Sequence, residues 1–156
     1  MRILLALFLS LSFCDLLGQA TKEDLHAVHT ELISQIKSTK QFREFYPELN
    51  DYLSFVDSQV LSSDQKDQLK KDAVKRHKQY QREFEEGAKA WADYVEELFG
   101  KDSKVKLLSE KLVAQKDGSL EVEFILTNED NSIEERFRYT AIYVQNSLKI
   151  IDGFYY

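Results

Sequence analysis

Helical periodicity occupies the chain up to Gly100, and strand periodicity follows it. Before Gly100, apolar residues recur at steps of three and four, the spacing of one face of a helix. This spacing predicts helices over residues 22–45, 47–60 and 64–99. Helices followed by strands are typical of an α+β domain, so we expect the three helices to pack on a sheet.

The predicted helix starts carry recognisable signals. Thr21 with Asp24, and Ser62 with Gln65, have the spacing of a capping box, in which each side chain bonds to the other residue's backbone N–H. Pro47 suits the first position of the second helix, because a proline there loses no helical hydrogen bond. We therefore expect helices to begin just after Thr21, at Pro47 and just after Ser62.

The third predicted helix is long, about 50 Å from Asp64 to Phe99 at 1.5 Å per residue. Gly87 costs about 1 kcal/mol relative to alanine inside a helix, so it marks a bend or a close packing point, and the sequence leaves both open. Residues 64–82 contain seven basic and three acidic residues. We interpret this stretch as a solvated helix face, with a surface for anionic lipids or an acidic partner as the alternative. The basic residues are Lys66, Lys70, Lys71, Lys75, Arg76, Lys78 and Arg82.

Apolar and polar residues alternate in four segments after Gly100, which predicts a four-stranded antiparallel sheet. Even-numbered positions from Leu120 to Leu126 are apolar and share one face, whereas Glu121 and Glu123 point to the other. We expect these glutamates to meet Arg136 and Arg138 of the next strand on the open face. The apolar positions of that next strand are Phe137, Tyr139, Ala141 and Tyr143.

The turns between the strands predict their register. A three-residue loop at Lys116–Gly118, with Gly118 in the left-handed region, brings the apolar faces of the first two strands together. This loop aligns Leu108, Leu112 and Ala114 with Leu126, Val122 and Leu120, respectively.

A tight loop before the last strand predicts a second register. It places Ile150 opposite Tyr143 and Phe154 opposite Tyr139. In this register Asp152 falls on the inner, apolar face near Ala141.

Three helices followed by a meander that ends in Leu148-Lys149-Ile150-Ile151-Asp152-Gly153-Phe154-Tyr155-Tyr156 resemble the nuclear transport factor 2-like (cystatin-like) superfamily. The closing strand of that superfamily often reads W-K-I-x-D-G. The resemblance implies a cone, in which a curved sheet wraps around helices and encloses a pocket. Members use this pocket for catalysis, small-molecule binding or protein binding, so the fold alone does not predict a function.

The first 20 residues predict a signal peptide. Arg2 precedes the apolar run 3–9, and Gly18-Gln19-Ala20 supplies the small residues of a cleavage site. The apolar run is too short for a membrane span, so we expect a secreted or periplasmic chain that begins at Thr21, without stable membrane insertion. Lipidation of Cys14 is the alternative, which bulky Phe13 disfavours.

The remaining residues, 21–156, have the length of one domain and contain no cysteine. We therefore expect a single domain that folds on its hydrophobic core without disulfides. The formal net charge of −6 argues against nucleic-acid binding. The sequence leaves open whether the chain is a monomer or a homodimer.

The polar residue with the most chemical interest is Asp152. On an apolar face beside Tyr139 and Tyr143, its carboxylate would be desolvated and able to act as a general base. We favour a solvated carboxylate at a strand end, because no acid or base partner is recognisable, and we assign no catalytic residue. We predict that a ligand pocket, if the aromatic residues do more than fill the core, is lined by Trp91, Tyr139, Tyr143 and Asp152.

A metal site has little support in the sequence. His26 and His29 lie three residues apart on the first predicted helix, a spacing that suits two metal ligands, with Glu23 or a residue from elsewhere in the chain as a third. No further histidine or cysteine completes a recognisable pattern, so we predict no metal and no cofactor. His77, on the apolar stripe of the third helix, is interpreted as a packing residue.

These observations favour an exported, non-enzymatic binding or accessory domain with an apolar pocket for a small hydrophobic molecule or a protein segment. One alternative is an isomerase- or dehydratase-type enzyme that uses Asp152 with Tyr139 or Tyr143. The other is a protein-interaction module that docks a partner on the third helix.

Overall fold

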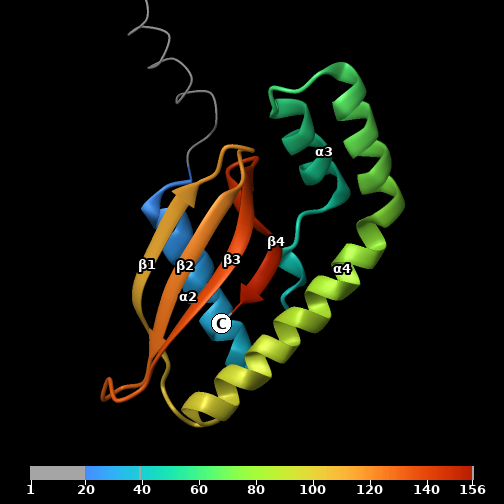
Figure 1. Cartoon of the computed structure of the whole chain (residues 1–156). Helices are drawn as coiled ribbons and strands as arrows, with labels where there is room; N and C mark the ends of the chain where they lie inside the picture. The colour runs from blue at the N-terminus through green and yellow to red at the C-terminus, as the bar shows by residue number, and fades with distance from the viewer. Residues whose placement is uncertain (1–19, 39, 156) are drawn as a thin grey trace, which may run out of the picture.

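A computed structural model describes residues 20–38 and 40–155, so the predicted signal peptide and Cys14 lie outside the described residues. The strands form one antiparallel sheet in the order β1-β2-β3-β4, with the helices in contact with it (Figure 1). This arrangement confirms the predicted α+β fold. The elements are α2 (Lys22–Ser38), η1, a 3-10 helix (Arg43–Phe45), α3 (Leu49–Ser58), α4 (Ser63–Phe99), β1 (Lys106–Ala114), β2 (Leu120–Thr127), β3 (Glu134–Val144) and β4 (Ser147–Tyr155).

Both predicted capping boxes are confirmed. The Thr21 N–H donates to Asp24 Oδ2 (2.7 Å), and the Asp24 N–H donates to Thr21 Oγ1 (3.1 Å). At the start of α4, the Gln65 N–H donates to Ser62 Oγ (3.3 Å), and the Ser62 N–H donates to Gln65 Oε1 (3.1 Å). As predicted, α4 ends at Gly100, whose φ of 86° stops the helix.

The first helix is shorter than predicted. It ends at Ser38 rather than Phe45, and Lys40 has a positive φ of 49° that turns the chain away from the helix. Phe42 and Phe45 are nevertheless buried in the same core as α2. Their burial therefore continues the apolar pattern of the helix without continuing the helix.

The second helix also has different ends. It begins at Leu49, after an N-cap at Glu48 whose N–H donates to Asp51 Oδ2 (3.0 Å), so Pro47 precedes the helix instead of opening it. It ends at Ser58, and Val60 lies beyond it.

The register of β1 and β2 follows the predicted loop over most of its length. Gly118 has a φ of 81°, and the Gln115 N–H donates to the Ser119 carbonyl (2.8 Å) to close the three-residue loop. Ala114 then pairs with Leu120 and Leu112 with Val122, as predicted. A bulge at Leu108 breaks the pattern further along, so that Leu107 rather than Leu108 lies opposite Leu126. Leu108 is left 47% exposed.

The register of β3 and β4 differs from the prediction. Gln145 and Asn146 both have positive φ (51° and 61°), which makes a two-residue hairpin turn. Ile150 consequently lies opposite Ala141, not Tyr143.

Asp152 is displaced by the same change. A further irregularity between Ile150 and Asp152 sets Asp152 opposite Thr140 and Gly153 opposite Tyr139, the position predicted for Phe154. Asp152 is therefore exposed and does not lie beside Ala141 on the inner face.

The outer face of the sheet is only partly open. Arg138 Nε donates to Glu123 Oε2 (3.0 Å), and Arg136 Nη1 lies 3.6 Å from Glu123 Oε1, which confirms the predicted charge pairing at Glu123. Nearer the β3–β4 turn, however, Ile142 and Val144 are buried, and α3 contacts β3.

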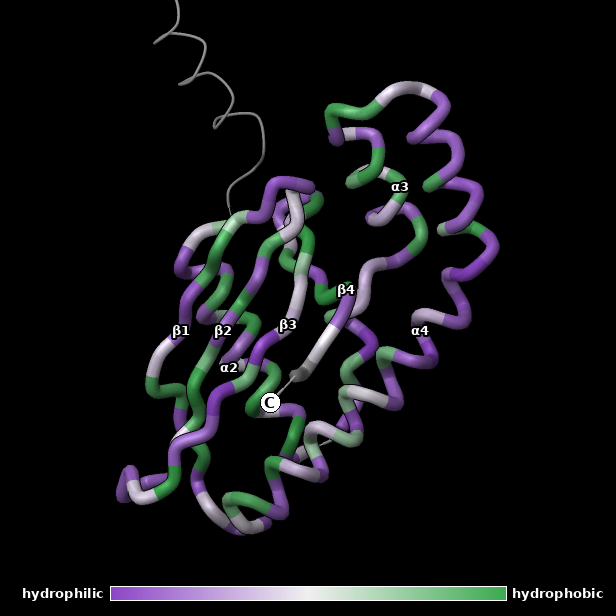
Figure 2. Tube along the Cα trace, in the orientation of Figure 1, coloured by the Kyte–Doolittle hydropathy of each residue, from purple (hydrophilic) through white to green (hydrophobic). Residues whose placement is uncertain are grey.

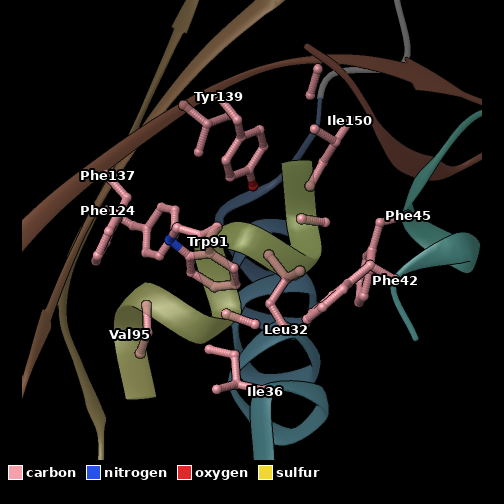
Figure 3. Close-up of a cluster of buried hydrophobic side chains, with 14 of the residues drawn as sticks. Leu32, Ile36, Phe42, Phe45, Trp91, Val95, Phe124, Phe137, Tyr139 and Ile150 are labelled. Carbon is pink, nitrogen blue, oxygen red and sulfur yellow. The ribbon is translucent and has the colours of Figure 1, made fainter. Parts of the chain in front are cut away.

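Aromatic side chains fill the space between the inner face of the sheet and the helices (Figure 3). Trp91 packs edge-on against Phe137 (ring centroids 5.6 Å apart) and Phe124 (6.0 Å), with Leu32 and Phe42 on its other sides. Each of these five side chains is at most 2% exposed. The interior that the resemblance predicts as a pocket is thus a packed core.

Two parts of the molecule can be distinguished. The sheet, α2 and residues 84–99 of α4 form the body, and α3 with residues 63–83 of α4 forms the lobe, which stands beside the sheet (Figure 1). The α4 part of the lobe is mainly hydrophilic (Figure 2).

Candidate functional site

The four residues predicted to line a ligand pocket do not meet at one site. Trp91 and Tyr139 are 1% exposed and belong to the packed core. Tyr143 is half-buried, and its hydroxyl donates to Asp24 Oδ2 (3.2 Å). Asp152 is exposed and lines a separate cavity. Their role in ligand binding stays a prediction.

A buried polar relay joins α2, β1 and β3. His29 Nδ1 lies 2.8 Å from Glu110 Oε2, and the Tyr139 hydroxyl lies 3.0 Å from His29 Nε2. The His29 ring also stacks on Phe124, with centroids 4.5 Å apart. Glu110 reaches this position because the β1–β2 register places it opposite Phe124, on the inner face.

The protonation state of the relay follows from burial. Burial lowers the pKa of His29, and the hydrogen bond and charge of Glu110 offset part of that effect. Burial raises the pKa of Tyr139, which stays protonated. The consistent assignment has Nδ1–H of a neutral His29 donating to the Glu110 carboxylate, while Nε2 accepts from the Tyr139 hydroxyl.

This order of groups is similar to that of a catalytic relay, but the relay has no access for a substrate. The His29 side chain is fully buried, that of Glu110 is 6% exposed, and both ring nitrogens of His29 already have partners. The exposed His26 touches the relay from outside, with Nδ1 3.3 Å from Glu110 Oε1. We conclude that the relay positions α2 against the sheet.

The sequence contained signals for this relay. Glu110 has the same parity as Leu112 and Ala114, and His29 lies four residues after Leu25 and three before Leu32, on the apolar stripe. His26 and His29 both contact the Glu110 carboxylate. Within residues 20–38 and 40–155, no three His, Cys, Asp or Glu residues are placed to hold a metal ion.

A cavity of about 480 Å³, which we call the tyrosine cavity, lies between the start of α3, the middle of α4 and β4. Burial and the neighbouring Tyr52, Tyr80 and Glu83 raise the pKa of Tyr46 to about 12. The Tyr46 hydroxyl is therefore uncharged at neutral pH. The polar side chains of the wall are Tyr46, Tyr52, Tyr80, His77, Glu83 and Asp152.

A second hollow, of about 980 Å³, separates the lobe from the β1–β2 turn, and we call it the lobe groove. Its floor and rim include apolar side chains at the end of α3 and the start of α4. Val60 is 86% exposed, Leu61 37% and Leu69 38%. The other apolar members are Tyr52, Phe55, Val56 and Ile151.

The seven basic residues found between positions 64 and 82 lie on the lobe part of α4. Lys70 forms an ion pair with Asp57, and Lys66 Nζ donates to the Asp57 carbonyl (2.6 Å), so both brace α3 against α4. Lys71 and Lys75 are exposed. Some of these basic residues therefore connect α4 to α3 within the lobe, and others are exposed to solvent.

The described residues form an α+β domain with a packed core, and the tyrosine cavity and the lobe groove are among the hollows on its surface. Comparison of the chain with family models, curated proteins and solved structures yields no match. None of the helices formed by residues 20–38 and 40–155 has the length and apolar character of a membrane span.

Proposed function

We propose that the chain is an exported, non-enzymatic binding domain that holds an apolar segment of a partner protein in the lobe groove. The observation that carries this proposal is the gathering of exposed apolar side chains at one hollow. Val60, Leu61 and Leu69 all line the groove. Single exposed apolar residues are ordinary on a protein surface, whereas a group of them around one concavity is typical of an interaction site.

The shape and surroundings of the groove favour a protein segment over a small molecule. The groove is lined from two sides, by the α3–α4 hairpin and by residues 115–119 of the β1–β2 turn. Lys116 and Asp117 of that turn are exposed and line the groove as well. An extended segment with apolar residues in the groove and charged or polar residues at its rim would match both features.

An enzyme that uses Asp152 with Tyr139 or Tyr143 has less support. The Tyr139 hydroxyl faces His29 in the core, and the Tyr143 hydroxyl donates to Asp24 at the start of α2. Asp152 lines the tyrosine cavity, whose walls include neither Tyr139 nor Tyr143. The residues of that hypothetical reaction therefore do not face one another.

A relation to the nuclear transport factor 2-like superfamily belongs to the same proposal. Its support is the order of elements, three helices and then a four-stranded meander, and the Asp152-Gly153 pair in the last strand. Because the interior is a packed core, we propose a binding site on the outer surface of the domain and not inside it.

An apolar anionic dye, 8-anilinonaphthalene-1-sulfonate, tests the groove. We expect its fluorescence to rise on binding to the native protein and to fall back in the double variant Val60→Ser/Leu69→Ser. Leu108→Ser is the control, because Leu108 is an apolar residue whose exposed fraction of 47% lies between those of Leu69 (38%) and Val60 (86%), but it lies on β1 outside the groove. Dye binding that survives the double variant, or that Leu108→Ser removes as well, contradicts the proposal.

Native mass spectrometry of the protein purified from its source separates the two kinds of ligand. A bound polypeptide supports the proposal. A retained small molecule favours a small hydrophobic ligand instead, and a mass that includes residues 1–20 contradicts cleavage after Ala20.

A further inference from the structure

We propose that the tyrosine cavity is a binding site for a small organic cation, such as a quaternary or alkylated ammonium ion. The proposal is independent of the lobe groove, although Tyr52 and Ile151 lie in the walls of both hollows. It rests on the aromatic walls, the charges and the size of this cavity.

The walls present several aromatic rings to one space. Tyr46 packs against Phe84 (ring centroids 5.3 Å apart) and against His77 (5.8 Å), and all three line the cavity. Tyr52 and Tyr80 are close enough to Tyr46 for their charges to affect its pKa. The faces of such rings attract a cation that lies within about 6 Å of the ring centre.

The charged groups of the wall are carboxylates. Glu83 and Asp152 come from α4 and β4, respectively, and among the described residues no lysine or arginine lines the cavity. The Gln79 side chain donates to Glu83 Oε1 (2.8 Å), which fixes the carboxylate on the helix. A neutral apolar ligand makes no use of these two charges, and an anion is repelled by them, so the wall favours a cation.

One basic residue approaches from outside. Arg76 Nη1 donates to the Tyr80 hydroxyl (3.3 Å), but Arg76 does not line the cavity. The positive charge of its guanidinium repels a cation that is bound in the cavity. Removing it is therefore expected to strengthen cation binding.

The size of the cavity suits a small molecule. About 480 Å³ lies within the range of about 300–1,000 Å³ that is usual for ligand pockets. A trimethylammonium group with a short alkyl chain fits such a space and contacts several rings at once.

Isothermal titration calorimetry with two probes of nearly equal shape tests the charge. Choline carries the trimethylammonium group, and 3,3-dimethylbutan-1-ol replaces its nitrogen with carbon. We expect choline to bind about tenfold more tightly or better, because only the cation gains from the rings and carboxylates. Equal affinities, or no binding of choline at millimolar concentration, would overturn the proposal.

Carboxylate variants locate the site. Glu83→Gln and Asp152→Asn are each expected to weaken choline binding about two- to fivefold, with a smaller effect at high salt. Glu86→Gln is the matched control, because Glu86 is exposed on the same helix one turn further along and does not line the cavity. An effect of Glu86→Gln equal to that of Glu83→Gln contradicts the site.

Ring variants separate the aromatic face from the hydroxyl. Tyr80→Phe keeps the ring and should keep choline affinity, whereas Tyr80→Leu should weaken it about two- to fivefold. Arg76→Gln should raise the affinity, because it removes a positive charge that bonds to the Tyr80 hydroxyl from outside the cavity. Tyr80 and Arg76 are exposed, so these variants are expected to fold, which far-ultraviolet circular dichroism verifies. A loss of affinity in Tyr80→Phe equal to that in Tyr80→Leu overturns the role of the ring.

Discussion

The two halves of α4 belong to one continuous helix, but they bury very different sets of side chains. The body half, residues 84–99, buries six of its side chains, including Trp91, whereas the lobe half, residues 63–83, buries Ala73 alone. The contrast is visible in the colours of the tube, where the lobe half is mainly hydrophilic (Figure 2). Helical structure therefore continues where the packing that usually stabilises it is thin.

Local interactions support the lobe half. It begins at a capping box, and side chains four residues apart are bonded to each other, such as Gln68 to Asp72 (3.2 Å) and Gln79 to Glu83 (2.8 Å). The ion pair of Lys70 with Asp57 adds a contact to α3. Because these local interactions maintain the helix, its apolar and aromatic side chains remain accessible. Both proposed sites need such side chains, the lobe groove for a protein segment and the tyrosine cavity for a small cation.

Truncating one large apolar residue in each half should give the largest difference between them. Trp91→Ala is expected to lower the free energy of unfolding by about 3–5 kcal/mol, because it opens a cavity among Phe124 and Phe137. Leu69→Ala, at a residue that is 38% exposed, should cost less than about 1 kcal/mol. Urea unfolding followed by circular dichroism measures both, and equal costs would contradict the division into body and lobe.

The buried relay offers a second way to weaken the body alone. Glu110→Leu leaves the Nδ1–H of His29 without its acceptor in the core, so we expect a loss of about 1–3 kcal/mol. Dye binding in the lobe groove should be unchanged. Glu121→Leu, at an exposed carboxylate on the outer face of β2, is the control and should cost less than about 0.5 kcal/mol.

The relay also predicts a dependence of stability on pH. Because burial lowers the pKa of His29, the folded chain binds fewer protons than the unfolded chain as the pH falls through about 6.5. The free energy of unfolding should therefore decrease from pH 7 to pH 5, by at most about 1.4 kcal/mol per pH unit from this group. The charged and titratable groups next to it are Glu110, His26 and Tyr139.

Urea unfolding at pH 7, 6 and 5 checks the direction and the source of this dependence. His29→Gln should flatten the dependence, whereas His26→Gln, at a side chain that is 64% exposed, should retain it. A free energy of unfolding that is constant over this range, or a slope that persists in His29→Gln, contradicts the assignment of a neutral His29.

The sequence predicted those features that depend on neighbouring residues. The two capping boxes, the end of α4 at Gly100, the apolar face of β2 and the loop at Gly118 each follow from residues within a few positions of one another. The end of α2 was predicted wrongly. Phe42 follows the apolar residues of α2 at helical spacing, but it is buried because it contacts Trp91, which is far away in the sequence.

The position of Asp152 shows a different limit. Its register depends on positive φ angles at Gln145 and Asn146, which glycine would have signalled more clearly, and on an irregularity in β4. The inward position of Glu110 could have been predicted, because alternate residues of a strand share one face and Leu112 and Ala114 were already assigned to the inner face. The tyrosine cavity and the lobe groove depend on how the lobe packs against the sheet. This packing could not be predicted from patterns of neighbouring residues.

Gly87 provides the smallest expected effect and lies near the boundary between the two halves of α4. It is exposed, and a Cβ atom at this position would have no heavy atom within 4 Å, so the structure contradicts a close packing point. Gly87→Ala should therefore raise the free energy of unfolding by about 0.5–1 kcal/mol, because alanine restricts the unfolded chain and favours the helix. Gly100→Ala is the matched opposite, since a φ of 86° strains any residue with a Cβ atom, and it should destabilise the protein. If Gly87→Ala instead lowers stability, flexibility at this position is needed for the lobe to sit correctly on the body.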